Sequence, residues 1–211
     1  MQIVHLLGQE TIINTTELSG TLGLIATVIL TCNLVLGIML SNSFKKSNWG
    51  FRLPEKVKAI DVNKLHNYTA YIALLLVIFH IVLIPLDAFT KFTYKDVLWP
   101  ANAPHQATIV FLGTFSFLAL LLVIITTQKV IKRKLSFSLW KKIHLISYGT
   151  CILFVAHGLL MDPALKDRPI DWIDAEKLLS EICGFVLLLA FILRYKYYIY
   201  NARKNNSKTY N

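Results

Sequence analysis

Charged residues are scarce in this chain of 211 residues: they make up 16% of the sequence, whereas 55% of the residues are hydrophobic. Several stretches of about 16 to 20 residues carry almost no charge, and about 20 apolar residues are what one helix needs to cross a bilayer. Such a composition excludes a single soluble globular domain. It indicates an integral membrane protein.

Cysteine, proline and glycine are also few, at 3, 6 and 9 residues. The odd number and wide spacing of Cys32, Cys151 and Cys183 exclude a disulfide framework and a zinc pattern, so we interpret them as small apolar fillers. No Ser-rich linker, low-complexity run or short-period repeat is present, which favours one domain of packed helices. Phosphate-binding loops, dinucleotide fingerprints and Ser/His/Asp arrangements are absent too, which favours a module that receives its electrons from elsewhere.

What the sequence does contain is a set of long apolar blocks. Each block predicts a membrane-spanning helix, because backbone groups in hydrocarbon must be hydrogen-bonded within their own segment or within a closed barrel. The N-terminus lacks the basic start and cleavage site of a secretory signal, so no segment is expected to be removed. The predicted fold class is all-α, a polytopic membrane helix bundle of about five transmembrane helices. The blocks are residues 22–40, 68–86, 107–126, 143–160 and 178–193.

Basic residues alternate in number between the segments outside these blocks. The rich segments, 41–65, 128–142 and the residues from 194 onward, hold six, six and five; the poor ones, before residue 20, 90–105 and 161–177, hold none, two and three. Because positively charged loops stay inside, this pattern predicts an N-terminus outside and a cytoplasmic C-terminus. The formal charge of +10 then reflects membrane insertion and some attraction to anionic lipid, and no nucleic-acid partner is expected.

Four of the six histidines lie within or at the ends of just two of the predicted spans, which is the most informative feature of the sequence. His66 and His80 belong to the second span, with His66 just before its apolar block, and His144 and His157 belong to the fourth. Both helices are predicted to run outward, so His66 and His144 share an inner level and the other two an outer level. The separations of fourteen and thirteen residues correspond to about 21 and 19.5 Å along a helix, so the levels match.

The angular positions of the histidines agree less well. Fourteen residues bring His66 and His80 to within about 40° of one helix face, whereas thirteen leave His144 and His157 about 140° apart. The fourth helix therefore needs a tightened turn, a tilt, or cofactors approached from different sides. Gly149 is the expected place for an irregular turn.

Imidazole pairs at two depths suit haem, because haem iron accepts axial imidazoles and neutral histidine is its usual nitrogen ligand. We therefore expect two stacked haem b groups whose six-coordinate iron favours electron transfer, with the protein supplying spacing, dielectric and orientation. Small residues on the two helices leave room for a flat macrocycle: Thr69, Ala70 and Ala73 on one, and Ser147, Gly149, Thr150 and Cys151 on the other.

Roles without haem stay open for these histidines. A membrane histidine can simply make an interhelical hydrogen bond, and a group of them can bind zinc or copper. A His-lined metal transporter or channel without haem would need polar spans, yet besides histidine these contain only Asn33, scattered Ser or Thr, and Asp87 near an outer end. A haem-free scaffold protein is the third possibility.

The His-x13-His and His-x12-His pairs, together with Trp140 and His144 in a W-x3-H motif, resemble the ferric reductase-like transmembrane domain family. That family includes ferric reductases, NADPH oxidases and the bacterial haem subunit that serves a periplasmic methionine sulfoxide reductase. The resemblance covers about residues 20–200 and implies an inner and an outer haem on the histidine pairs at these two levels, with outward electron flow. Family members usually have six spans, and many carry a cytoplasmic flavin and nicotinamide domain that has no counterpart here.

Together these features predict a membrane cytochrome b, an electron-transfer subunit of an oxidoreductase in a bacterial cytoplasmic membrane. The expected donor is a cytoplasmic flavoprotein reductase or a quinol, and the expected extracytoplasmic acceptor is ferric iron, a quinone or a redox partner protein. Residues 1–19 are predicted as an extracytoplasmic segment, 20–200 as the dihaem domain and 201–211 as a basic cytoplasmic tail.

Charged residues at the ends of the spans are weaker candidates. The basic ones could bind haem propionates but are equally ordinary topology charges, and the acidic loop after His157 is more simply solvated than cation-binding. His5 and His105 are expected to be interfacial. The basic candidates are Arg52, Lys64, Lys141 and Lys142 inside and Lys91, Lys166 and Arg168 outside, and the acidic ones are Asp162, Asp167, Asp171 and Asp174.

Overall fold

The computed structural model describes residues 15–42, 52, 54–87, 90–162 and 175–209, with side chains described up to residue 201 apart from those of residues 175 and 176. Throughout these ranges the regular structure is helical and no strand occurs. Five helices are long and apolar enough to cross a membrane, which confirms the predicted fold class. The spans are Thr15–Ser41, Val62–Leu86, Ala107–Thr127, Phe137–Leu160 and Lys177–Asn201.

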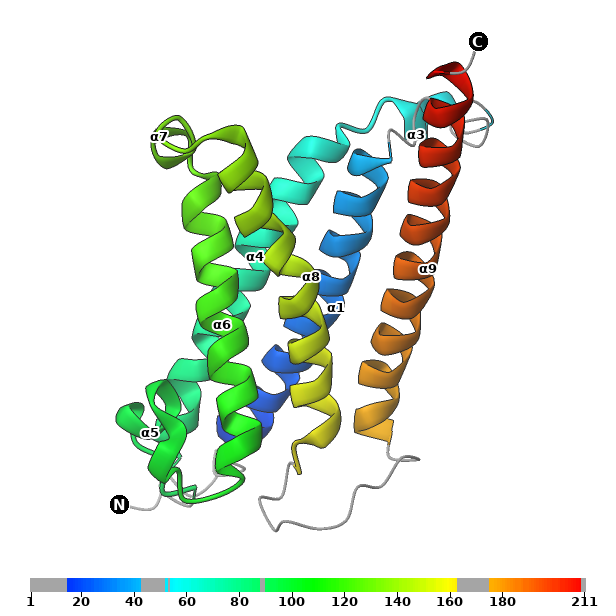
Figure 1. Cartoon of the computed structure of the whole chain (residues 1–211). Coiled ribbons are helices and arrows are strands. Elements are labelled where there is room, and N and C mark those ends of the chain that lie inside the picture. The colour runs from blue at the N-terminus through cyan, green and yellow to red at the C-terminus, as the bar shows by residue number, and fades with distance from the viewer. Residues whose placement is uncertain (1–14, 43–51, 53, 88–89, 163–174, 210–211) are drawn as a thin grey trace, which may run out of the picture.

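The spanning helices alternate in direction (Figure 1). α1 (Thr15–Ser41), α6 (Ala107–Thr127) and α9 (Ala175–Thr209) run toward the end of the bundle that carries the C-terminus. α4 (Val62–Leu83) and α8 (Phe137–Leu160) run the opposite way. α4 and α8 are therefore parallel to each other and antiparallel to the other three spans.

We call the end of the bundle that carries the C-terminus the basic end. Two short helices lie there, α3 (Glu55–Lys58) and α7 (Lys129–Lys132), and both α4 and α8 begin there. The Asp61 side chain caps α4 by accepting hydrogen bonds from two backbone N–H groups, and the Ser136 hydroxyl caps α8 by accepting one. These polar caps explain why the two helices begin before their apolar blocks do.

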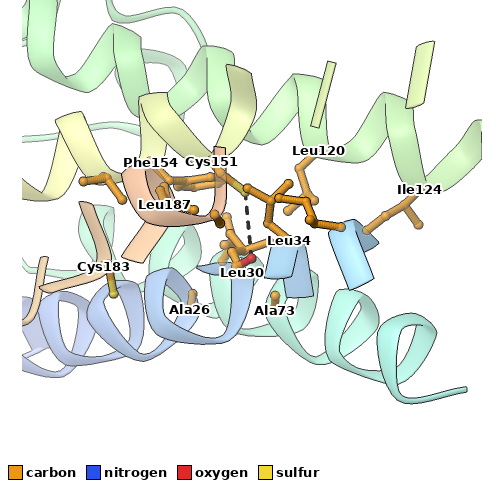
Figure 2. Close-up of a cluster of buried hydrophobic side chains, with 14 residues drawn as sticks. Ala26, Leu30, Leu34, Ala73, Leu120, Ile124, Cys151, Phe154, Cys183 and Leu187 are labelled. Atoms are coloured by element: carbon orange, nitrogen blue, oxygen red, sulfur yellow. Dashed lines mark hydrogen bonds between the residues drawn. The ribbon is translucent and has the colours of Figure 1, made fainter. Parts of the chain in front are cut away.

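α1 packs against α4, α8 and α9 and supplies the largest part of the buried core. Its buried apolar residues recur every four positions, as expected for one face of a helix. Side chains of α4, α8 and α9 meet this stripe at mid-depth, where the Cys151 thiol lies 3.8 Å from the carbonyl oxygen of Leu30 (Figure 2). The stripe consists of Ala26, Leu30, Leu34 and Ile38, and Ala73, Phe154, Cys183 and Leu187 pack against it.

The connection from α4 to α6 closes the opposite end of the bundle. It contains η3 (Ile84–Leu86), α5 (Tyr94–Leu98) and η4 (Pro100–Asn102). Thr93 and Asp96 form a capping box at the start of α5, and the hydrogen bonds from Thr93 hold the pKa of the Asp96 carboxyl below its ordinary value. The chain is thereby fixed in place before α6 begins.

Candidate functional site

The four histidines singled out in the sequence meet as two pairs. The ring centres of His66 and His144 are 6.1 Å apart, and those of His80 and His157 are 6.4 Å apart. In each pair one ring comes from α4 and the other from α8, with ring planes inclined at 72° and 77°. We call His66 and His144 the basic-end pair and His80 and His157 the far pair. The structure thus brings together the histidines that the sequence placed at the same level.

α8 is α-helical without interruption from Phe137 to Leu160. The irregular turn expected at Gly149 is not found, and that expectation was wrong. A regular helix presents His144 and His157 on different sides, and their neighbours differ accordingly: the first stacks on Trp140 of α8 itself, whereas the second bonds to α6. Histidines from two helices can pair at two levels without lying on one face of each helix.

Backbone carbonyl groups fix three of the four rings through their Nδ1 atoms. A carbonyl oxygen can only accept, so Nδ1 carries the proton and donates in each case. Nε2 is then unprotonated, which is the form that binds a metal ion. The Nδ1-to-oxygen distances are 3.0 Å for His66 and Asn33, 2.8 Å for His80 and Ser19, and 2.8 Å for His157 and Ile109.

A glycine follows each of these carbonyl groups by four residues and lies against the same ring. A Cβ atom at Gly37 or Gly23 would lie 3.2 Å from the ring of His66 or His80, and one at Gly113 only 2.8 Å from the ring of His157. A side chain at these positions would displace the ring, so glycine is what lets the helix backbone come close enough to accept the hydrogen bond. We call each carbonyl and its glycine a carbonyl–glycine seat.

The two seats on α1 repeat at the interval of the histidines. Ser19 and Asn33 are fourteen residues apart, as are Gly23 and Gly37, and as are the histidines they face on α4. Because α1 and α4 run antiparallel side by side, equal intervals keep both seats in register with both rings. Sequence reasoning missed these residues, although the shared interval of fourteen was there to be found.

The polar side chains of the α1 seats add a second contact to each histidine. The Asn33 amide donates to the carbonyl of His66 and, at 2.7 Å, to the hydroxyl of Thr69. The Ser19 hydroxyl donates to the carbonyl of His80 at 3.0 Å. Asn33, which the sequence suggested only as an isolated polar group, therefore ties α1 to α4 beside the basic-end pair.

Replacing Asn33 by leucine is expected to destabilise the cofactor-free bundle by about 1 kcal/mol, since interhelical hydrogen bonds in membrane proteins contribute about 0.6 kcal/mol each. Denaturant titration of helicity in mixed micelles measures the loss. The matched control is Cys32→Ala, at an exposed neighbouring position of the same helix. If the two variants had equal free energies of unfolding, the hydrogen bonds of the Asn33 side chain would not stabilise the bundle.

His144 is held differently from the other three. Its Nδ1 atom is buried and has no hydrogen-bond partner in the part of the chain that the structure describes. Its ring stacks on Trp140, one turn earlier on α8, with centres 5.3 Å apart and planes inclined by 19°. The Lys132 ammonium group lies 3.9 Å from the centre of the Trp140 ring, within the range of a cation–π interaction.

The spacing within each pair fits two axial ligands of one metal ion. A ligating imidazole nitrogen lies about 2 Å from the metal and the ring centre about 3 Å, so rings on opposite sides have centres about 6 Å apart. Among the residues that the structure describes, no three His, Cys, Asp or Glu side chains form a group that could hold an ion by themselves. Two protein ligands per centre suit haem, whose porphyrin supplies the other four, better than a tetrahedral zinc site.

Most of the other charged candidates are exposed or lie beyond the described residues. Lys64, Lys141 and Lys142 are exposed, and the Lys64 ammonium lies 3.9 Å from the Asp61 carboxylate. The His105 ring faces Phe92, with centres 6.3 Å apart. Residues His5, Lys166, Arg168, Asp167, Asp171, Asp174 and the loop that contains the last five lie outside the described residues.

The fold and the paired imidazoles define a polytopic membrane protein with histidines matched across two parallel spans. The family model described as "Ferric reductase like transmembrane component" matches residues 22–155, more than half of the chain, and the protein belongs to this family. The match covers His66, His80 and His144 and ends two residues before His157. Neither curated proteins nor solved structures gave a match to the chain.

Proposed function

We propose that this protein is a membrane cytochrome b that passes electrons across the bilayer through two haem b groups. The basic-end pair would hold one haem and the far pair the other. The observation that carries the proposal is the distance between ring centres, 6.1 and 6.4 Å, in two pairs that each join the same two parallel helices. Haem bound in this way supplies reversible one-electron chemistry at its iron.

The chain's own residues orient and tune these ligands. The carbonyl groups of Ser19, Asn33 and Ile109 accept the Nδ1 protons, which leaves Nε2 available to a metal ion and makes it a stronger donor to that ion. Between the two levels, Ala73 and Cys151 are buried in an apolar layer that excludes water and charge. Electrons would therefore pass through a low-dielectric region between two fixed sites.

The distribution of charge supports one orientation of the bundle in the membrane. We place the basic end in the cytoplasm, because loops rich in Lys and Arg stay on that side of the membrane. Electrons would then enter at the basic-end pair from a flavoprotein reductase or a quinol. They would leave at the far pair to an extracytoplasmic acceptor such as ferric iron, a quinone or a redox partner protein. The protein would be the electron-transfer subunit of an oxidoreductase in a bacterial cytoplasmic membrane.

The purified full-length protein is expected to contain two haem b groups per chain. Pyridine haemochrome assay against protein concentration measures the ratio, and the reduced-minus-oxidised absorbance spectrum identifies b-type haem. Metal analysis of the same sample tests the rival metal transporter, which would carry zinc or copper instead. A helical, monodisperse preparation from haem-replete cells that is colourless would overturn the proposal.

A further inference from the structure

Within the described part of the chain, two buried ring nitrogen atoms at the basic end have no hydrogen-bond partner. Trp140 Nε1 and His144 Nδ1 have no hydrogen-bond partner among the described residues, and they belong to stacked rings one helical turn apart. Nearly all buried polar groups in native proteins are hydrogen-bonded, so two neighbouring groups without a hydrogen bond indicate a missing partner. The indole N–H only donates, and His144 Nδ1 also donates when Nε2 is the ligating nitrogen. No described residue supplies this acceptor, and a bound group with an acceptor oxygen would complete the site.

The charges around these groups indicate that the acceptor is an anion. Lys132 lies over the Trp140 ring and forms no salt bridge among the described residues. The segment 128–142 holds six basic residues and no acidic one. A carboxylate or phosphate oxygen would satisfy the Trp140 N–H group and the positive charge of Lys132 together, and hydrogen bonds to ionised acceptors are stronger than those between neutral groups.

The position of Trp140 indicates which anion it is. Trp140 precedes His144 by four residues, so it lies about 6 Å nearer the basic end along α8. A haem held by the basic-end pair carries two carboxylates on one edge of its macrocycle, and that edge reaches the level of Trp140 when it points toward the basic end. The alternative source with the same chemistry is the phosphate of a lipid headgroup.

We propose that the Trp140 Nε1–H donates to a carboxylate of the haem held by His66 and His144, with the Lys132 ammonium adding positive charge. This assignment rests on the proposed function. It replaces the exposed lysines at this end, Lys64, Lys141 and Lys142, as the anchor of that carboxylate. Trp140 is thus a positioning residue that fixes the rotation of the macrocycle about the axis between its two axial ligands.

The test compares two porphyrins in the full-length cofactor-free protein. Iron protoporphyrin IX and its dimethyl ester are titrated by absorbance in a neutral detergent, in a His80→Ala background that keeps the basic-end pair intact. Trp140→Phe keeps an aromatic ring beside His144 and removes the N–H. We expect Trp140→Phe to weaken binding of the free acid about tenfold and to leave binding of the ester unchanged. Trp99→Phe, at an exposed tryptophan of the opposite end, is the matched control.

A second variant tests the charge without altering the rings. Lys132→Gln lies on a surface helix at the basic end, and it should weaken binding of the free acid by a few fold, less so at high salt, and leave the ester unaffected. Repeating both titrations with added phosphatidylglycerol tests the lipid phosphate. If Trp140→Phe changes ester binding only when that lipid is present, the acceptor is the headgroup and the haem carboxylate is ruled out.

The remaining outcomes separate the two proposals. Equal weakening of both porphyrins by Trp140→Phe, or no effect on either, would overturn the carboxylate assignment and leave the haem proposal standing. A protein with native helicity and all four histidines that binds neither porphyrin would overturn the proposed function, and the Trp140 assignment with it.

Discussion

His80→Ala is expected to lower the haem content of the purified protein from two groups per chain to about one, because six-coordinate binding needs both axial imidazoles of a pair. His66→Ala should give the same stoichiometry with loss of the other group. In proteoliposomes, either change should abolish electron transfer from an enclosed reductant to an external acceptor, since one remaining haem cannot bridge two levels that lie about 21 Å apart. Haemochrome assay and the rate of acceptor reduction measure the two effects.

His105→Ala is the matched control for these changes. Its ring packs near Phe92 in the connection between α4 and α6, outside both pairs. The His105→Ala variant should retain two haems per chain and the full rate of electron transfer. If His80→Ala retained both haems as well, the far pair would not be a haem site.

Gly113→Ala is expected to displace the His157 ring and to weaken the haem of the far pair selectively. A Cβ atom at this position would lie 2.8 Å from the ring, closer than real contacts of this kind, so either the ring or α6 must move. The hydrogen bond from His157 to the Ile109 carbonyl would lengthen or break, with the loss of ligand orientation that second-shell partners provide. Loss of such a partner lowers metal affinity by about 10- to 100-fold.

Glycine-to-alanine changes elsewhere provide the control for Gly113→Ala. Gly149 lies in the interior of α8 with no atom near its Cβ position, so alanine there should favour the helix by up to about 1 kcal/mol and leave both haems bound. By helix propensity alone, Gly113→Ala would likewise stabilise its helix. A loss of haem in that variant would therefore come from the contact with the His157 ring and not from a weaker helix. Electron paramagnetic resonance of the oxidised protein distinguishes the two centres. An unchanged far-pair signal and full haem retention would show that the seat on α6 is not needed.

The number and positions of the spans follow from the sequence because hydrocarbon permits few backbone arrangements. Apolar runs therefore located all five helices, but three starts were placed six or seven residues too late. α1 begins at Thr15 rather than near residue 22. α4 begins at Val62 rather than near residue 68, and α8 at Phe137 rather than near 143. Polar caps and the first amphipathic turn extend a helix beyond its apolar block, and hydropathy does not register them.

The histidine levels were predictable from rise per residue, whereas the surroundings of the histidines were not. Depth depends on one helix at a time, so counting residues was sufficient for His66 and His144 to be matched. The angular argument left a tightened turn, a tilt or an approach from different sides open, and in the uninterrupted α8 the two histidines do lie on different sides. The hydrogen bond between His157 and the Ile109 carbonyl exists because α6 and α8 are neighbours. No local sequence pattern shows which helices will be neighbours.

α1 contributes no histidine, yet the register of α1 governs both centres. Its two carbonyl–glycine seats hold the imidazoles of His66 and His80 toward opposite ends of α4. The spacing along this one helix therefore sets the positions of both rings. One residue inserted between Gly23 and Gly37 would rotate the remainder of that helix by about 100° and lengthen it by about 1.5 Å. Only one of the two imidazoles could then keep its hydrogen bond to an α1 carbonyl. The interval between these glycines is thus constrained as tightly as the interval between the histidines themselves.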